Sequence, residues 1–395
     1  MNLIPEIVDS TEATKAFRQH LHRYPELGYE VHATADFVAE RLTAWGIPIT
    51  RGIGKTGLVG TLKRGTGVRS IGLRADMDAL PVSEANTFSH RSLHAGAMHA
   101  CGHDGHTSML LGAAHYLAHH GRFDGTIQFI FQPAEEGGAG GLAMVQDGLF
   151  SRFPVDAVFG VHNWPGLPAG FFGTRPGPLM ASGPMFHITV KGTGGHAARP
   201  HTAADALLAG SQIVVALQSV VSRNVDPMAS AVLSVVKFNA GTANNVVPAE
   251  ATMTVAVRTF GEGMTNLIEA RIRKLAQSVA EGFGCEAVVD CMPGYPATIN
   301  DPAMTQFALD VAKDVVGAEN CSSTITPTMT SEDFAFMLQQ RPGCYAFIGN
   351  GDGEHRGEGS GLGPCELHND SYDFNDALLP VGASYFARLA ERFLV

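Results

Sequence analysis

The sequence has few charged residues, and those it has are mainly acidic. Charged residues make up 16% of the chain, against about 25% in typical soluble domains. The 27 Lys and Arg are outnumbered by 38 Asp and Glu, which gives a net charge of −11 with histidine neutral. This balance argues against nucleic acid or an anionic membrane surface as the main partner, so we expect neither.

Cysteines and long hydrophobic runs are also scarce. Six cysteines are spread thinly over the chain, at positions 101, 285, 291, 321, 344 and 365, and this spacing favours free thiols in a reducing compartment. The first residues, MNLIPE, lack the basic and apolar segments of a signal peptide. No apolar run approaches the ~18 residues that span a bilayer. We therefore expect a cytoplasmic protein.

Glycine and histidine, by contrast, are abundant. The chain has 46 Gly and 17 His, and eight of the histidines fall between His90 and His120. Much glycine with little charge indicates a compact, enzyme-like globule rather than a disordered chain. At about 150 residues per domain, the length suggests two or three domains. The clustered histidines are the feature that a functional interpretation has to explain.

Strands and helices alternate through the first 160 residues and again near the end of the chain. Short apolar runs predict strands at 58–62, 70–73, 126–131, 157–161 and 344–348. Helical periodicity predicts helices within 11–46 and at 107–119, 301–316, 331–340 and 376–393. This alternation predicts an α/β fold with a mostly parallel sheet flanked by helices.

The pattern changes between residues 185 and 295. The elements predicted there are strand, helix, strand, strand, helix and strand, at 186–190, 203–221, 231–238, 251–257, 263–283 and 286–291. This is the ferredoxin-like βαββαβ order. We therefore predict one domain formed by residues 1–184 and 296–395, and a second domain inserted at 185–295.

Residues that can bind a metal follow two parts of this pattern. Cys101 and His103 lie two residues apart before a predicted helix, and thiolate and imidazole are ligands that Zn²⁺ and similar metals prefer. Glu135 and Glu136 follow the strand at 126–131, where α/β sheets place their ligands. One carboxylate on a metal and its neighbour acting as base would serve amide hydrolysis. Two acidic residues at a helix N-terminus are, however, also common without such a role.

Two further histidines extend this set. His162 follows the strand at 157–161, and His368 follows a glycine-rich loop at 349–364. Either of them alone is more often a structural hydrogen-bonding residue. Together the candidates exceed what one zinc ion uses, and they suit a pair of metals with shared ligands. The set is Cys101, His103, Glu136, His162 and His368.

Charged residues near these candidates indicate supporting roles. Asp78 is a candidate for orienting a ligand histidine, and Asp76 could do the same or cap a turn. In the inserted domain, Arg258 ends the strand at 251–257. Its planar guanidinium suits a substrate carboxylate, although an exposed arginine at a strand end is comparably common.

Five motifs, in order along the chain, carry a family resemblance. They are RADMDAL at 74–80, HACGHDGH at 99–106, QPAEE at 132–136, GHAARPH at 195–201 and SEDF at 331–334. With them the chain resembles the aminoacylase/carboxypeptidase superfamily of metal-dependent amidohydrolases. The similar branch contains hippurate hydrolases, N-acyl-amino-acid amidohydrolases and indole-acetyl-amino-acid hydrolases. The resemblance spans nearly the whole chain, from the segment at 17–26 to His368.

The resemblance implies a zinc-peptidase-like catalytic domain with two divalent metal ions per subunit. The metal ligands that it implies are Cys101, His103, Glu136, His162 and His368. It also implies that Glu135 is the general base and that the inserted domain covers the site. That domain would form a homodimer or a tetramer, in which His196 reaches the partner's site and stabilises the oxyanion. Asn245 and Arg258 match positions that contact the substrate, with Arg258 near its carboxylate.

One departure from the sister branches leaves the metal open. Those branches have a histidine where this chain has Asp76, and a bridging aspartate where it has His103. Because Cys101 would compensate for these changes in the ligands, the identity of the metal cannot be inferred from those branches. Cysteine with histidine favours Zn²⁺, and Mn²⁺, Co²⁺ or Ni²⁺ also suit such a site. Whether Asp76 is itself a ligand stays open.

The implied reaction is hydrolysis of the amide bond of N-acyl amino acids, hippurate-like or N-acetylated, to a carboxylic acid and a free amino acid. One alternative is a dipeptidase or aminopeptidase of the same superfamily. Another is a metal-binding protein without catalysis. Structural zinc sites favour closed Cys/His sets, whereas this set includes a carboxylate and has Glu135 beside it, which argues against the second alternative.

Overall fold

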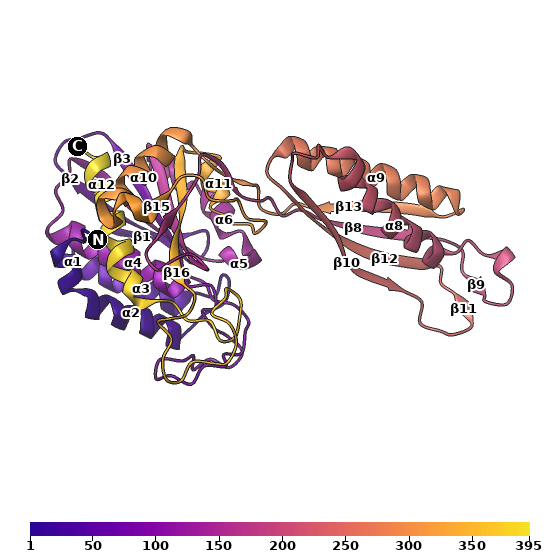
Figure 1. Cartoon of the computed structure of the whole chain (residues 1–395), viewed down its shortest axis with the longest axis horizontal. Coiled ribbons are helices and arrows are strands. Elements are labelled where there is room, and N and C mark those ends of the chain that lie inside the picture. The colour runs from indigo at the N-terminus through magenta and orange to yellow at the C-terminus, as the bar shows by residue number, and fades with distance from the viewer. The chain divides into compact units, whose positions relative to one another are not determined.

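The computed structural model describes all 395 residues, and the chain folds into two compact units (Figure 1). The first unit consists of Met1–Gly177, Ile299–Thr326 and Asp333–Val395. The second consists of Pro178–Thr298 and Pro327–Glu332. The insertion that we predicted at 185–295 lies within the second unit, which also includes the short return segment at 327–332.

The first unit is built on an eight-stranded sheet with the order β1-β2-β4-β3-β5-β16-β6-β15. Its strands are β1 Ile49–Ile53, β2 Gly57–Arg64, β3 Ser70–Asp76, β4 Gly125–Gln132, β5 Ala157–Pro165, β6 Phe172–Gly173, β15 Cys321–Ser322 and β16 Gly343–Gly351. The four neighbours β4, β3, β5 and β16 are parallel, and their residues are almost all buried, as expected of strands covered on both faces. The predicted mostly parallel sheet is confirmed.

Helices flank this sheet. They are α1 Pro5–Asp9, α2 Thr11–Arg23, α3 His32–Ala44, α4 His103–His119, α5 Glu135–Gly138, α6 Gly140–Gln146, α7 Leu149–Arg152, α10 Pro302–Val316, α11 Ala335–Leu338 and α12 Leu379–Phe393. Two 3₁₀ turns of this unit are η2 Ala318–Asn320 and η3 Asp376–Leu378, whereas η1 Pro200–Thr202 lies in the second unit. Helix α4 contacts β3, α2 and α12, and its residues from 103 to 114 are all buried. The helix that begins the histidine motif is therefore part of the core.

The helix predicted at 331–340 is wrong over most of its length. Only Ala335–Leu338 is helical. The Asp333 carboxylate accepts hydrogen bonds from the Gly141 amide and from Arg74, and Phe334 is fully buried against Tyr345. These long-range contacts hold the start of the segment outside a helix.

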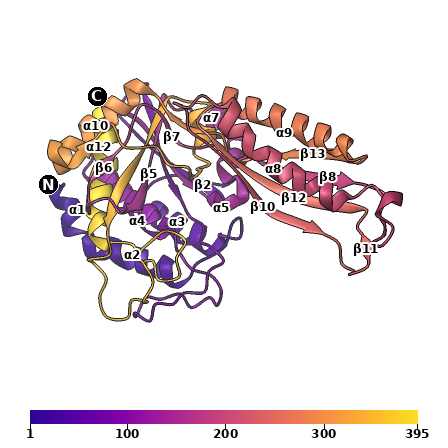
Figure 2. The ribbon, with the colours of Figure 1, turned by 45° about the vertical axis from the view of Figure 1, so that its right-hand side comes forward.

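Two long loops lie side by side at one end of the first unit (Figures 1 and 2). The loop before α4 and the glycine-rich loop after β16 are joined by hydrogen bonds from the Thr87 amide to the Gly359 carbonyl and from the Gly361 amide to Asn86 Oδ1. The loop after β16 carries His368. It is therefore anchored to the segment that leads to Cys101.

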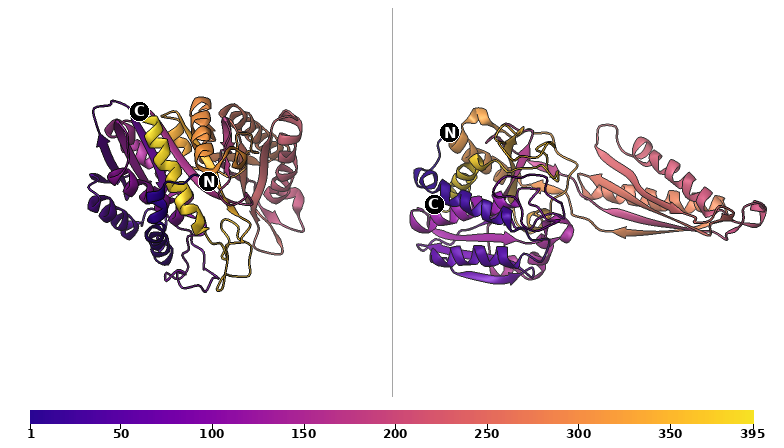
Figure 3. Two further views of the ribbon diagram at one scale, coloured as in Figure 1. Left: turned by 60° about the vertical axis from the view of Figure 1, so that its left-hand side comes forward. Right: turned by 90° about the horizontal axis from the view of Figure 1, so that it is seen from below.

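The second unit has a four-stranded antiparallel sheet with the order β10-β12-β8-β13. Its elements are β8 Met185–Lys191, α8 Ala206–Asn224, β10 Ala231–Ala240, β12 Glu250–Thr259, α9 Glu262–Gly282 and β13 Glu286–Met292, with the small pair β9 Gly195–His196 and β11 Val246–Val247. Strands β7 Gly177–Met180 and β14 Thr298–Asn300 form a separate pair. Helices α8 and α9 pack on one face of the sheet (Figures 1 and 3). The order of the main elements is βαββαβ.

One helix, α8, is long and apolar enough to cross a membrane by length and composition alone. It packs on β10, β12 and α9, and its buried residues include Ile213 and Leu217. A core helix of a soluble domain passes the same test, so this result is weak evidence for a membrane span.

Candidate metal centre

The carboxyl ends of the four parallel strands converge on one cluster of polar side chains. Asp76 ends β3, Glu135 and Glu136 follow β4, and His368 follows β16. His162 lies in β5, two residues after the pairing of β5 with β3 ends. Ligands in open α/β sheets bind at this edge because the loops after parallel strands meet there. The cluster is completed by the residues around the start of α4.

All five predicted ligand residues are brought together. Metal-binding atoms of Cys101, His103 and His162 lie within 4.8 Å of one another, and so do those of Cys101, Glu136 and His368. Cys101 Sγ is 3.4 Å from His162 Nε2, and His368 Nε2 is 3.3 Å from Glu136 Oε1. The five residues therefore form two overlapping triads that share Cys101, which is an arrangement suited to two neighbouring cations.

Hydrogen bonds orient the two buried imidazoles toward the cluster. His103 Nδ1 donates to the Asp78 carbonyl at 2.8 Å, and His162 Nδ1 donates to the Asn163 carbonyl at 2.6 Å. A histidine that donates one ring N–H to a carbonyl presents the lone pair of its other nitrogen, as metal ligands usually do. His103 Nε2 is buried and has no hydrogen-bond partner. An orphaned, inward-facing imidazole nitrogen fits a metal ion.

Asp78 contacts both a predicted ligand histidine and the glutamate segment. Its backbone carbonyl accepts the hydrogen bond from His103 Nδ1 at 2.8 Å, and its carboxylate Oδ1 lies 3.5 Å from the same nitrogen. The carboxylate also accepts hydrogen bonds from the amides of Glu135 at 2.9 Å and Glu136 at 3.0 Å. One residue thus fixes a ligand histidine and the segment that carries the two glutamates.

That glutamate segment is conformationally strained. Ala134 and Ala139, on either side of α5, have φ angles of 53° and 55°, in the left-handed region that non-glycine residues rarely adopt. Such residues cost about 1–3 kcal/mol each and cluster at functional sites. The Glu135 side chain is buried, with an oxygen within 4.8 Å of ligand atoms of His103 and Glu136. The strain therefore falls at the segment that aims Glu135 and Glu136.

Asp76 is engaged by other side chains. His106 Nδ1 donates to Asp76 Oδ1, and Arg74 Nη1 donates to Oδ2, both at 2.7 Å. Burial alone would raise the pKa of Asp76, but the nearby His103, Arg74 and His106 hold it well below its usual value. Its Oδ2 lies 3.8 Å from His103 Nε2. The contacts make Asp76 a charged support behind the cluster.

The electrostatics of the cluster favour a cation. Burial raises the pKa of the Cys101 thiol well above its usual value, and the carboxylates of Glu136 and Glu135 add to this. Burial opposes the charge of His103, yet Asp76 and Asp78 raise its pKa to about 10. Burial lowers the pKa of His162, so its imidazole is neutral. A bound cation would reverse the shifts of Cys101 and His103, because it favours the thiolate and the neutral imidazole.

Gly102, between Cys101 and His103, cannot carry a side chain. Its φ angle is 90°, and a Cβ atom there would clash with Asn163 Oδ1 and lie 2.6 Å from the Tyr372 hydroxyl. Asn163 Oδ1 lies 2.7 Å from His106 Nε2, and Asn163 Nδ2 donates to the Tyr372 hydroxyl at 2.5 Å. The glycine allows the ligand loop to approach this polar network closely.

The sequence interpretation missed the network behind the ligands. Arg74 is fully buried, and it donates to Asp76, to Gln132 Oε1 at 2.9 Å and to Asp333 Oδ1 at 3.1 Å. A charged residue within an otherwise apolar buried strand is the signal that could have found it. His106 carries a weaker signal, because it lies one turn from His103 on α4.

The remaining predicted residues lie in the second unit. His196 and Asn245 adjoin in the β9–β11 region, where the Ala197 amide donates to the Asn245 carbonyl at 3.0 Å. His196 is exposed within this unit. Arg258 is on β12 and donates from Nη1 to the Val257 carbonyl at 2.9 Å. Their predicted roles at the metal cluster stay predictions.

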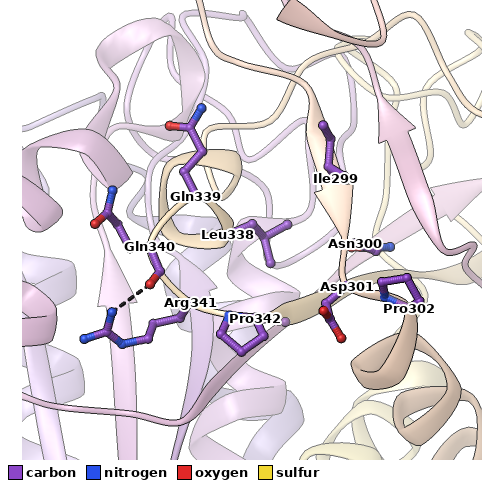
Figure 4. Close-up of a pocket in the computed structure, with 10 residues that line it drawn as sticks. Ile299, Asn300, Asp301, Pro302, Leu338, Gln339, Gln340, Arg341 and Pro342 are labelled. Atoms are coloured by element: carbon purple, nitrogen blue, oxygen red, sulfur yellow. Dashed lines mark hydrogen bonds between the residues drawn. The ribbon is translucent and has the colours of Figure 1, made fainter.

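A pocket of about 430 Å³ in the first unit is separate from this centre (Figure 4). It is lined by residues 299–302 and 338–343. Gly343 begins β16, so the pocket lies at the amino end of that strand, opposite the edge that carries the metal-binding residues. Arg341 Nη1 donates to the Gln340 carbonyl there.

Comparisons with known proteins agree with this geometry. Residues 72–392 match the model of peptidase family M20/M25/M40. The chain is 44% identical over 394 residues to a hippurate hydrolase of Campylobacter jejuni, and the match covers 100% of both chains. It is 38% identical over 370 residues to an N-acetyl-L-cysteine deacetylase of Bacillus subtilis, which covers 93% of this chain and 85% of the other.

A solved structure is similar in both fold and sequence. The YXEP protein of Bacillus subtilis, a dinuclear metal binding peptidase from the M20 family, superimposes with a TM-score of 0.84 and 32% identity, covering 98% of this chain and 99% of that one. The α/β fold with its central parallel sheet is therefore that of M20 peptidases. The matched residues 72–392 and the full-length identity of 44% show that this protein belongs to peptidase family M20/M25/M40.

Proposed function

We propose that this protein is a metal-dependent amidohydrolase that cleaves N-acyl amino acids to a carboxylic acid and a free amino acid. The observation that carries the proposal is the pair of triads that share Cys101, with the buried Glu135 carboxylate beside them. The relatives support the same chemistry, since hippurate hydrolase and N-acetyl-L-cysteine deacetylase are both named for N-acyl amino acids.

The residues present suit two divalent cations. We propose that one is held by Cys101, His103 and His162 and the other by Cys101, Glu136 and His368, because each set offers three donors within 4.8 Å. Thiolate with imidazole favours Zn²⁺, and Mn²⁺, Co²⁺ and Ni²⁺ are the alternatives. Such ions polarise the scissile carbonyl and lower the pKa of a water molecule.

Glu135 then handles the protons. Its carboxylate takes one proton from the attacking water and gives it to the nitrogen of the leaving amine, so that no proton is gained or lost over the cycle. The strained backbone and the Asp78 carboxylate hold the glutamate segment in place. A base positioned in this way loses little entropy when it meets the water.

The second unit would supply the other contacts. We propose that Arg258 binds the substrate carboxylate through its guanidinium fork, that Asn245 contacts the substrate, and that His196 of the partner subunit donates to the oxyanion. His196 and Arg258 both lie on antiparallel strands of this unit, and His196 is exposed there.

We further propose that the second unit forms a homodimer. Strand β10 is at the edge of its sheet and exposes Val232, Val236 and Phe238, while α8 exposes Leu208 and Val215. Unpaired apolar edge strands are ready templates for pairing with another chain. For location we propose the cytoplasm, since all six cysteines are free thiols.

Metal reconstitution followed by a substrate panel tests the function. Metal-depleted protein is loaded separately with Zn²⁺, Mn²⁺, Co²⁺ or Ni²⁺ and assayed on benzoyl-glycine, N-acetyl amino acids and dipeptides with a free amine. We expect hydrolysis of the N-acylated substrates and dependence on metal. Cleavage of the dipeptides alone would identify a dipeptidase instead, and hydrolysis without any bound metal would overturn the proposal.

A further inference from the structure

The guanidinium of Arg18, on α2, is a buried charge that the proposed chemistry does not use. Arg18 is fully buried, and it donates from Nε to Asp104 Oδ2 at 3.0 Å and from Nη2 to Asp373 Oδ1 at 2.6 Å. Asp376 Oδ1 is 3.5 Å from Nη1. Burial would lower the pKa of Arg18, but the three carboxylates raise it above its usual value. The side chain is thus a permanent cation that joins three separate parts of the chain.

Two of these carboxylates adjoin segments that carry metal-binding residues. Asp104 directly follows His103 in the first turn of α4. Asp373 is five residues after His368, in the loop that follows β16. The two segments also touch directly, because the His368 amide donates to the Ala100 carbonyl at 2.7 Å.

The backbone at His368 needs such support. Its φ angle is 63°, which is unfavourable for a residue with a side chain, and its side chain is 56% exposed within the first unit. His368 therefore lacks the tight packing that holds His103 and His162 in place. Its position depends on how the surrounding loop is anchored.

We propose that Arg18 is a positioning residue that holds the His368 segment against the Cys101–His103 segment, and so completes the triad of Cys101, Glu136 and His368. This inference rests on the proposed metal-dependent function. Arginine suits the task because its planar fork reaches two carboxylates at once, whereas a lysine ammonium is a point charge.

The contacts also predict that the effect is confined to one triad. Asp104 keeps a second partner, since His22 Nδ1 lies 2.8 Å from the same Oδ2 atom. The other side-chain neighbour of the Asp373 carboxylate is His90 Nε2, at 3.8 Å, and that nitrogen itself lies 3.0 Å from Arg18 Nη1. Loss of the Arg18 contacts therefore frees the His368 segment more than the start of α4.

Three variants separate positioning from general stability. Arg18→Lys keeps the charge and removes the fork, and Asp373→Asn removes one arm of the ion pair without leaving a buried cation unpaired. Asp376→Asn is the matched control, because this substitution also removes a carboxylate beside Arg18. Asp376 begins the 3₁₀ turn before α12 and so lies outside the His368 segment. Metal-depleted wild type and variants are titrated with Mn²⁺ by calorimetry, and thermal unfolding is measured in parallel.

We expect two binding events in the wild type and in Asp376→Asn. In Arg18→Lys and Asp373→Asn we expect one event to be unchanged and the other to weaken at least about tenfold, as happens when groups that support metal ligands are removed. Equal affinities in all four proteins, or equal weakening of both events, would overturn the inference even if the variants unfold at lower temperature. Absence of binding of all four cations, Zn²⁺, Mn²⁺, Co²⁺ and Ni²⁺, by the wild type in the same titration would instead contradict the proposed function.

Discussion

Asp78 shows how much of the site depends on one residue. Its carbonyl orients the imidazole of His103, and its carboxylate accepts the amides of Glu135 and Glu136. The sequence could indicate Asp78 because ligating histidines usually have a carboxylate partner. It could not indicate that the carbonyl takes this part, since every residue has a carbonyl. The distribution of roles within the residue follows only from the folded backbone.

Asp78→Asn should reduce activity strongly with little change in folding. An amide can accept one of the two backbone N–H groups, but its NH₂ faces the other, so the glutamate segment loses its charged acceptor. We expect kcat to fall about 10–100-fold, the range found when groups supporting metal ligands are changed. The control is Asp156→Asn, because Asp156 also accepts a backbone amide, from Ser70 at 2.7 Å, but is exposed. Equal activities of both variants would contradict the role assigned to Asp78.

The imidazole of His22 makes stability depend on pH. Burial alone would lower its pKa, but hydrogen bonds with Asp104 and Glu84 raise it to about 9. Because the folded pKa exceeds the ordinary value, the charged form stabilises the fold. This contribution, on the order of 3 kcal/mol, is complete below about pH 6.5 and is lost as the pH rises through about 9.

Denaturant unfolding of wild type and His22→Gln across this range measures that effect. The difference in unfolding free energy between the two proteins should shrink as the pH rises from 6.5 to 9. In this range unfolding releases the proton of His22 in the wild type, and the variant has no such proton to release. Contributions from other groups cancel in the difference. A difference that stays constant with pH would show that His22 is neutral in the folded protein.

At the scale of elements, the ends of parallel strands explain why separate motifs meet. Apolar runs and the polar residues after them are visible in sequence, so the meeting of Glu136 and His162 at one sheet edge could be predicted. The sequence could not predict that α4 starts at His103, four residues before the expected start. Contacts such as that of Arg74 with Asp333 join residues 259 positions apart, and no local pattern encodes them. Long-range pairing also explains why the helix predicted at 331–340 is mostly absent.

Gly102→Ala tests the junction of the ligand loop with α4. The new Cβ atom would meet Asn163 Oδ1 and the Tyr372 hydroxyl in addition to the unfavourable φ angle. Gly46→Ala is the matched control, because Gly46 also has a positive φ, of 73°, but faces open space. We expect the control to lose about 1 kcal/mol of unfolding free energy and Gly102→Ala to lose at least about 2 kcal/mol, as close contacts in packed sites do. Equal losses of unfolding free energy in the two variants would mean that Asn163 and Tyr372 move to accommodate the methyl group.

The whole molecule consists of one unit that contains all five predicted metal ligands and a second unit that contains none of them. The change of pattern near residue 185 made the second unit visible in the sequence. The return of 327–332 to that unit was not visible, because this segment has no periodicity of its own. If the second unit dimerises and supplies His196 to its partner, each active site needs two chains.

Mixing two inactive variants tests this sharing. His196→Ala and Glu135→Gln homodimers should both be inactive, because each lacks one group at every site. After subunit exchange, half of the dimers are mixed, and each mixed dimer has one intact site, so about a quarter of wild-type activity should return. The control is a mixture of His196→Ala and wild type that goes through the same subunit exchange. No recovery in exchanged mixtures would place His196 at the site of its own chain, and an active His196→Ala homodimer would place it outside the reaction.

In the proposed reaction Glu135 moves the proton while its neighbours hold the metals. Bound metal per chain, measured together with kcat on benzoyl-glycine for wild type and Glu135→Gln after identical reconstitution with Zn²⁺, separates these two roles. We expect two ions per chain in both proteins and a loss of at least about 100-fold in kcat for the variant, the scale of general acid–base catalysis. A variant that binds both ions and keeps wild-type turnover would contradict the role of Glu135.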